Sequence, residues 1–106
     1  MKLFKYQSYG ASIETVAFEP AKYRNGRLAL QMLSQMEEGQ VGPYGVPTIN
    51  IPDISPLDES CAFIDENNFP DIGFWFELQG IAEPTGRTAQ SGFCTYPEYR
   101  FDTTKI

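Results

Sequence analysis

Turn residues between short β-prone runs constrain the fold of this chain more than any other feature of its sequence. Gly10 separates two such runs, at residues 2–9 and 12–19. Asn25-Gly26 is a strong hairpin signal because both residues tolerate positive φ, and it directly precedes a third run at 27–34. Apolar side chains alternate in that run, and the turn before it favours a strand over the helix that the same residues would also fit.

The middle of the chain alternates short apolar runs with loops. We predict a turn at 37–39 and an irregular Gly/Pro segment up to Pro47. A strand at 48–51, a polar loop at 52–60 and a short apolar strand or connector at 61–65 should follow.

Residues 71–79 form the best helix candidate. Their apolar side chains recur at helical spacing, and Gly80 supplies a C-terminal stop. Asn67 and Asn68 are the predicted N-cap, because their side chains accept hydrogen bonds from free backbone N–H groups.

The C-terminal third is predicted to be a loop at 84–92 followed by a last strand at 93–101. Pro97 cannot donate a ladder hydrogen bond, so this strand should lie at a sheet edge or carry a bulge. The order of elements predicts an α+β fold, with a small antiparallel sheet of about five strands and one helix packed across it. A chain of 106 residues is expected to form a single domain, 1–106.

The residue inventory argues against an enzyme. Histidine is absent, which removes the commonest general base and the commonest transition-metal ligand. Adjacent carboxylates point to opposite sides of a strand, so acidic pairs in the sequence are not catalytic pairs in space. We expect no catalytic residue, no metal site and no cofactor.

The two cysteines and the hydropathy indicate the compartment. No run approaches the roughly 20 apolar residues that cross a bilayer, and residues 1–10 lack the apolar core of a secretory signal. We therefore expect a cytoplasmic protein that does not enter a membrane. In that compartment Cys61 and Cys94 should be reduced, partly buried thiols rather than a disulfide.

Positive and negative residues are segregated along the chain. Residues 1–27 carry five cations and two carboxylates, whereas residues 28–86 carry ten carboxylates and no Lys or Arg. Residues 87–106 hold three cations and two carboxylates, which brings the net charge to −6. A protein of this sign repels phosphate, so we expect no direct binding to nucleic acid.

The acidic segment has two interpretations. Exposed carboxylates keep a small protein soluble, and nearby arginines can neutralise them. Alternatively, they form one surface that attracts a basic partner protein, such as the groove of a nucleic-acid-binding nuclease complex, by presenting negative charge in place of phosphates. The candidate partner-binding acids are Glu37, Glu38, Asp53, Asp58, Glu59, Asp65 and Glu66.

Two other segments are candidate binding sites. If the helix packs through Ile72 and Phe76, Phe74 and Trp75 cannot both be fully buried, and an exposed aromatic there would mark an apolar binding patch. The predicted loop at 86–92 has the small, hydroxyl-bearing composition of an anion-binding nest, although it lacks the Gly-Lys-Ser/Thr of a phosphate-binding loop.

Three stretches of the sequence carry a family resemblance. They are YRNGRLAL at 23–30, FIDENN at 63–68, and a final block at 86–101 with the pattern GRTxxSGFCTYPxYRF. Together they resemble a small family known only as a domain of unknown function, found in plasmids, integrative elements and phages of gut-associated bacteria. The resemblance implies an accessory protein of a mobile element and carries no catalytic residues.

We therefore predict a non-catalytic mobile-element or phage accessory protein. Small acidic proteins of such elements often bind host defences, so by analogy it would inhibit a host defence protein, in the manner of an anti-CRISPR or anti-restriction protein, through its acidic surface. One alternative is a structural or regulatory accessory protein that binds another element protein through the apolar patch. The other is a small-ligand or anion-binding domain. Nothing in the sequence indicates an oligomeric state.

Overall fold

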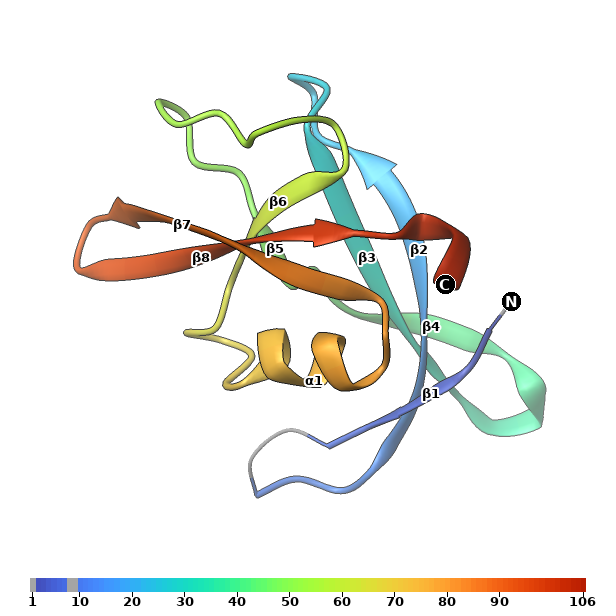
Figure 1. The fold of residues 1–106 in the computed structure, drawn as a ribbon. Helices are drawn as coiled ribbons and strands as arrows, with labels where there is room; N and C mark the ends of the chain where they lie inside the picture. Colours follow the sequence, from blue (N-terminus) through green and yellow to red (C-terminus); the bar gives the residue numbers. More distant parts are fainter. Residues whose placement is uncertain (1, 8–9) are drawn as a thin grey trace.

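A computed structural model describes residues 2–7 and 10–106, apart from the side chain of Glu38. These residues form two four-stranded antiparallel sheets, one α-helix and two short 3-10 helices (Figure 1). The predicted α+β class is confirmed, but the prediction of one sheet with about five strands is wrong.

The N-terminal sheet has the order β1-β2-β3-β4 and consists of β1 (Phe4–Tyr6), β2 (Glu14–Lys22), β3 (Leu28–Gln35) and β4 (Val41–Gly45). The predicted turn between β2 and β3 is confirmed, since Gly26 has a φ of 87° and donates its N–H to the Tyr23 carbonyl oxygen. A 3-10 helix, η1 (Glu37–Gly39), takes the place of the predicted turn between β3 and β4.

The C-terminal sheet has the order β5-β6-β8-β7 and consists of β5 (Thr48–Ile49), β6 (Cys61–Ile64), β8 (Cys94–Phe101) and β7 (Ala82–Ser91). The predicted strands at 48–51, 61–65 and 93–101 are confirmed within one or two residues at each end. After β8 the chain ends in a second 3-10 helix, η2 (Thr103–Lys105).

Two strands contradict the sequence prediction. The segment predicted to be irregular contains β4, and the predicted loop at 84–92 is most of β7. Both are edge strands that contain proline, Pro43 and Pro84, and an edge strand has a free side on which a missing N–H breaks no ladder. With these two strands added, the chain completes two separate sheets instead of one.

Helix α1 (Ile72–Leu78) confirms the predicted helix but starts differently. The predicted N-cap at 67–68 is wrong: the N-cap is Asp71, in a left-handed conformation with φ of 61°, and Asn68 instead donates its side-chain amide to Asp65 in the preceding turn. Gly80 ends the helix as predicted, with φ of 72°.

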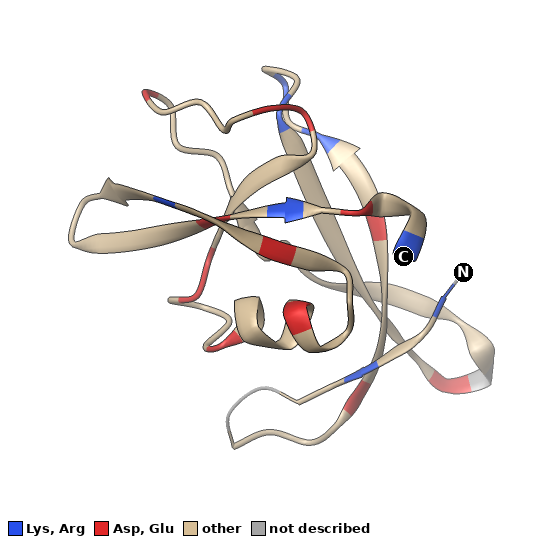
Figure 2. Cartoon of the chain, in the orientation of Figure 1, with Lys and Arg blue, Asp and Glu red and all other residues tan. Residues whose placement is uncertain are grey.

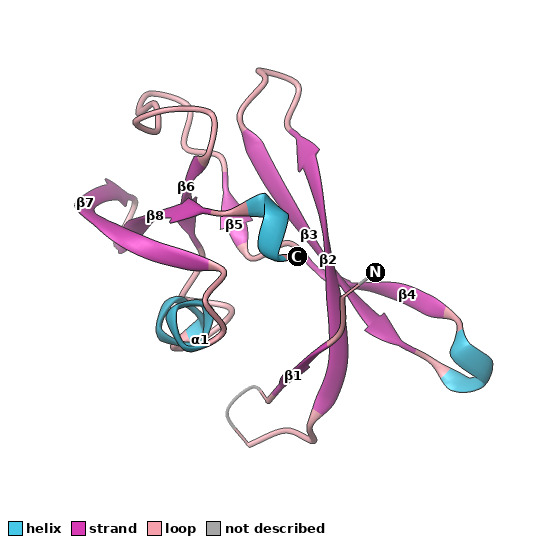
Figure 3. Cartoon of the chain, turned by 45° about the vertical axis from the view of Figure 1, so that its right-hand side comes forward, coloured by secondary structure: helices cyan, strands magenta, loops and turns pink. Residues whose placement is uncertain are grey.

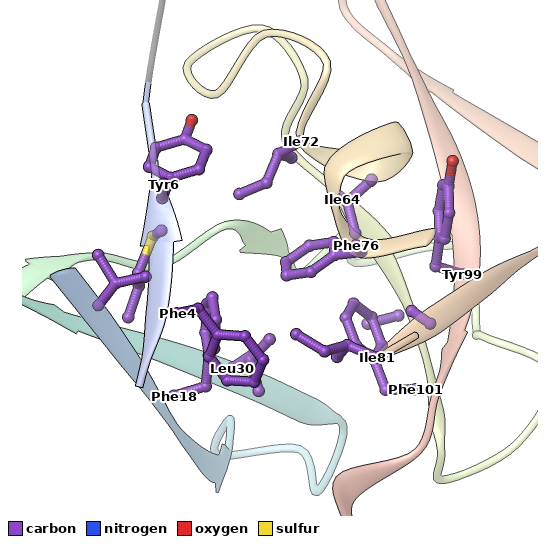
Figure 4. Close-up of a cluster of buried hydrophobic side chains, with 14 of the residues drawn as sticks. Phe4, Tyr6, Phe18, Leu30, Ile64, Ile72, Phe76, Ile81, Tyr99 and Phe101 are labelled. Carbon is purple, nitrogen blue, oxygen red and sulfur yellow. The ribbon is translucent and has the colours of Figure 1, made fainter. Parts of the chain in front are cut away.

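The main core lies between the two sheets, and α1 closes it on one side (Figure 3). Phe76 of α1 is fully buried and contacts both sheets, with ring centroids 5.7 Å from Phe18 of β2 and 5.1 Å from Phe101 of β8 (Figure 4). The short helix therefore gains its stability from tertiary packing rather than from its own length.

A second, smaller core lies on the other face of the C-terminal sheet. It contains Ile51, Phe63, Ala89 and Tyr96. Ile51 belongs to the loop between β5 and β6, so this loop covers the sheet face that α1 does not. Burial on both faces explains why all four residues of β6 are buried.

Pro97 lies on an interior strand, because β8 pairs with both β6 and β7. The predicted edge position is therefore excluded. The alternative, a bulge, matches a register shift in β7 between Pro84 and Thr88, where Thr88 is the residue opposite Pro97. Both cysteines are free, with Cys61 buried and Cys94 partly buried, as expected. Among the described residues, no helix has the length and apolar character needed to cross a membrane.

Candidate functional site

The structure divides the candidate acids among three places (Figure 2). Glu37 lies on η1, at the end of the β3–β4 hairpin, and the side chain of Glu38 lies outside the described part of the chain. Asp65 and Glu66 follow β6 and lead into α1. The loop between β5 and β6, residues 50–60, carries Asp53, Asp58 and Glu59.

Three arginines surround the β5–β6 loop. Arg27 donates from Nη1 to the Ile51 carbonyl oxygen at 2.5 Å and from Nη2 to Ser55 Oγ at 3.2 Å. Arg87 donates to the Ser55 carbonyl oxygen at 3.2 Å. Arg27 lies just before β3 and Arg87 lies on β7, so cations from other parts of the chain hold the acidic loop.

Asp58 forms the clearest ion pair of this loop. Its Oδ2 lies 3.0 Å from Nη2 of Arg100, and its Oδ1 accepts hydrogen bonds from the backbone N–H and hydroxyl of Ser60. The hydrogen bonds from Ser60 and Arg100 hold the pKa of Asp58 well below its usual range. Burial, together with a hydrogen bond to Asp58, raises the pKa of the Cys61 thiol. Both effects favour a charged Asp58 and a neutral, unreactive Cys61.

Glu98 of β8 binds the same loop from the side of the sheet. Its side chain is fully buried and accepts hydrogen bonds from the Leu57 N–H at 2.9 Å and from the Thr85 hydroxyl at 2.6 Å. Nη1 of Arg87 lies 3.8 Å from the same carboxylate. A buried carboxylate with these partners holds the loop against the sheet, and its complete burial keeps it out of contact with a ligand at the surface.

The acids near α1 are not held by cations in this way, although Glu83 lies opposite Arg100 in the β7–β8 ladder. Glu66 accepts the Gly73 N–H at the start of the helix, and Glu77 accepts the Tyr99 hydroxyl at 2.8 Å. Burial, and then the hydrogen bond to Glu77, raise the pKa of the Tyr99 phenol well above its ordinary value. Within the described chain, none of the acids Glu66, Asp71, Glu77 and Glu83 makes an ion pair.

A shallow groove runs beside the C-terminal end of α1. Its lining includes the carboxylates of Glu77 and Glu83 and that of Asp102 at the end of β8, with Ile81 and Ala82 between them. Arg100 also lines the groove, but its guanidinium is bonded to Asp58. The groove is therefore negatively charged over an apolar base.

Phe74 and Trp75, the predicted apolar candidates, differ in their surroundings. Trp75 packs against Phe4 and Tyr6 of β1, and its indole N–H donates to the Lys5 carbonyl oxygen at 3.0 Å. Trp75 is therefore a structural residue that fixes α1 to the N-terminal sheet. Phe74 is 61% exposed and is the member of the pair that faces solvent.

Leu78 is the apolar residue that the sequence analysis does not identify. It is 67% exposed and follows Phe74 by four residues, so the two side chains lie on the same outer face of α1. The helical spacing that buries Ile72 and Phe76 also places Phe74 and Leu78 on the outer face. The exposure of Leu78 could therefore have been predicted from the spacing of the apolar residues in the sequence.

Neither an anion-binding loop nor a metal site is formed by the described residues. Residues 86–91, proposed as part of an anion-binding loop, lie in strand β7, and residues 88–91 pair with β8. Across residues 2–7 and 10–106, no three His, Cys, Asp or Glu side chains gather in a way that would hold a metal ion. The arrangement that stays open to a partner is a set of unpaired carboxylates beside an exposed apolar pair.

Comparison with known proteins places the chain in a family. It has no significant match among curated proteins or among solved structures. A model of a domain of unknown function, DUF4313, matches residues 17–106, which covers all of the C-terminal sheet, α1, β3, β4 and most of β2. The chain therefore belongs to the DUF4313 family of proteins of unknown function.

Proposed function

We propose that this protein is a non-catalytic binding protein that recognises a positively charged protein partner. The resemblance implies an accessory protein of a plasmid, integrative element or phage, and by analogy with other small acidic proteins of such elements it would bind and inhibit a host defence protein. The partner would be the basic, nucleic-acid-binding surface of a defence nuclease, and the protein would occupy it in place of nucleic acid.

One observation carries this proposal. The sequence has 14 acidic and 8 basic residues, yet ion pairs within the described chain involve only Asp58 and Glu98. The arginines closest to the acidic segment, Arg27, Arg87 and Arg100, are engaged with the β5–β6 loop. The other exposed carboxylates keep their charge available, and such charge steers association with a basic surface.

The test measures protection and binding together. The protein is expressed in a bacterial host that carries a restriction or CRISPR system, and the efficiency of transformation with a targeted plasmid is compared with that of an untargeted plasmid. The proposal expects protection of the targeted plasmid, and capture of a basic defence component that is released by about 0.5 M salt, because screening at that ionic strength is strong. If the captured partner stays bound at about 0.5 M salt and the targeted plasmid is not protected, the proposed function is contradicted.

The alternative is an accessory protein that binds another element protein through an apolar patch. The exposure of Phe74 and Leu78 on one helix face favours it. Salt separates the two functions, because apolar docking is insensitive to ionic strength whereas attraction between surface charges is not.

A further inference from the structure

Building on the proposed function, we infer that the outer face of α1 is the docking site, and that its occupant is a short basic amphipathic helix of the partner protein. We call this site the α1 surface, and it comprises the exposed pair Phe74 and Leu78 with the flanking carboxylates Glu77 and Glu83. An apolar ridge of the partner would cover the pair, and Lys or Arg side chains beside that ridge would meet the carboxylates.

Phe74 and Leu78 occupy the one side of α1 that the described structure leaves exposed. The other sides of α1 are covered: Ile72 and Phe76 are fully buried, and Trp75 packs on β1. Phe74 and Leu78 lie one helical turn apart, are 61% and 67% exposed, and have no part in either core. Two large apolar side chains adjacent on one helix face form a patch rather than a single exposed residue, and such patches mark binding surfaces.

The carboxylates beside Phe74 and Leu78 favour a positively charged partner. Glu77 follows Phe74 on the helix and lines the groove that also contains Glu83 and Asp102. The cation of the groove, Arg100, is held by Asp58 at 3.0 Å. Hydrogen bonds from Thr104, and then the charge of Lys105 on η2, lower the pKa of the Asp102 carboxyl. Glu77 and Glu83 have no ion pair within the described chain, so a partner with Lys or Arg at this point gains charge complementarity without displacing one.

The same charges argue against a second copy of this chain as the occupant. A two-fold contact through the α1 surface would place Glu77 and Glu83 of one copy against the same residues of the other, and like charges brought together in an interface are destabilising. The small area of a seven-residue helix, about 10 Å long, also fits a short segment better than a stable dimer interface.

The experiment uses three synthetic 18-residue peptides as probes, labelled for fluorescence anisotropy. The first has an amphipathic helical pattern of Leu and Lys, the second has the same pattern with Glu in place of Lys, and the third has Ser in place of Leu. We expect the Leu/Lys peptide to bind at least about tenfold more tightly than either of the others, because it alone supplies both the apolar ridge and the cations.

Variants locate the site. The double substitution Phe74→Ser and Leu78→Ser should weaken binding of the Leu/Lys peptide by at least about tenfold. Glu77→Gln with Glu83→Gln should weaken it less and flatten its salt dependence, because the apolar contact stays. The matched controls are Phe93→Ser, at the fully exposed tip of the β7–β8 hairpin, and Glu19→Gln on β2, and both should leave binding unchanged. Circular dichroism melts confirm that each variant is folded.

The outcomes separate this inference from the proposed function. If the Leu/Lys peptide binds equally well to the Phe74→Ser/Leu78→Ser variant, the α1 surface is not the site, although a basic partner still binds. If the Leu/Glu peptide binds as tightly as the Leu/Lys peptide, the charge argument is wrong. If neither lysine peptide binds, both the docking site and the attraction to basic partners are overturned. Self-association that Phe74→Ser/Leu78→Ser abolishes would identify a second copy as the occupant and overturn the inference.

Discussion

The β5–β6 loop and the α1 surface are both acidic and carry no Lys or Arg of their own, but they differ in their surroundings in space. The loop brings Asp53, Asp58 and Glu59 into a region where three arginines donate hydrogen bonds. The α1 surface keeps its carboxylates without an ion pair in the described chain and sets them beside exposed apolar side chains. A run of acidic residues can be recognised in the sequence. Whether it forms a negatively charged surface depends on the fold, which either brings arginines close to the acids or leaves the acids without them.

The difference follows from the second core. The loop covers Phe63 and Tyr96 on the outer face of the C-terminal sheet, so its backbone and side-chain polar groups need partners close to an apolar surface. Arg27 just before β3, Arg87 of β7, Arg100 of β8 and the buried carboxylate of Glu98 supply them. On the outer face of α1, Phe74 and Leu78 stay exposed in the described structure. We therefore expect the loop to contribute mainly to stability and the α1 surface to contribute mainly to binding.

Glu98→Gln is the largest expected perturbation of the loop. An amide has one acceptor oxygen, so Gln cannot accept from the Leu57 N–H on one side and the Thr85 hydroxyl on the other. The Arg87 guanidinium also loses its charged partner. We expect a loss of about 2–4 kcal/mol in the free energy of unfolding, measured by urea denaturation.

Glu83→Gln on the neighbouring strand is the control for this prediction. Glu83 is exposed and makes no ion pair in the described structure, so its replacement should change stability by less than about 0.5 kcal/mol. If Glu98→Gln also falls within that range, the buried carboxylate does not hold the loop.

Gly73→Ala tests how closely α1 sits on the C-terminal sheet. A Cβ at this position would lie 2.5 Å from Oη and 2.7 Å from Cζ of Tyr99. We expect a loss of about 1–3 kcal/mol from this overpacking, because the buried ring has to shift. That loss exceeds the gain of about 1 kcal/mol that Ala brings to a helix interior. A thermal melt measures it, with Gln79→Ala at the exposed end of the helix as the control. A more stable Gly73→Ala variant would show that the contact yields easily.

Part of this fold was predictable from local signals. The Asn25-Gly26 hairpin, β3 and α1 each carry their own signal in a turn residue or a hydrophobic period, and the structure confirms all three. The edge strands β4 and β7 were not predictable in this way. Their Pro and Gly residues predict a loop. They form strands because each pairs on one side with a neighbouring strand, β4 with β3 and β7 with β8.

The candidate site was predictable only in part, for the same reason. Phe74 follows from helical spacing, and Leu78 was accessible by the same argument. The partial burial of Trp75 depends on β1, which precedes it by about 70 residues and whose Lys5 carbonyl oxygen accepts the indole N–H. The pairing of Asp58 with Arg100 likewise joins residues far apart in the chain. Contacts of this kind decide which acids are free, and no local pattern encodes them.

Tyr99→Phe should change how the free energy of unfolding depends on pH in the alkaline range. The phenol has a raised pKa in the folded state, so between the unfolded value of about 10 and the folded value the unfolded chain binds fewer protons, and stability falls as pH rises. Removing the hydroxyl removes that proton linkage and should flatten the fall above about pH 10. Urea midpoints between pH 8 and pH 11 measure it. An unchanged slope would show that Tyr99 ionises as freely in the folded protein as in the unfolded chain. Tyr6, whose pKa burial also raises, contributes a remaining slope in both proteins.

Asp58→Asn gives the smallest expected effect and the sharpest test of the comparison. The pair with Arg100 is about half exposed on both sides, so its contribution near pH 7 is modest and screened by salt. Because the folded pKa of Asp58 is lowered far below the unfolded value of about 4, the contribution is fully present above pH 4 and declines as pH falls from there toward the folded value. The difference in urea midpoint between wild type and Asp58→Asn should therefore be largest at pH 7 and smaller, though not abolished, at pH 3. Asp53→Asn in the same loop should match wild type at both. If Asp58→Asn weakens binding of the Leu/Lys peptide as strongly as Glu77→Gln with Glu83→Gln, the loop is part of the binding surface and the two regions do not divide stability from binding.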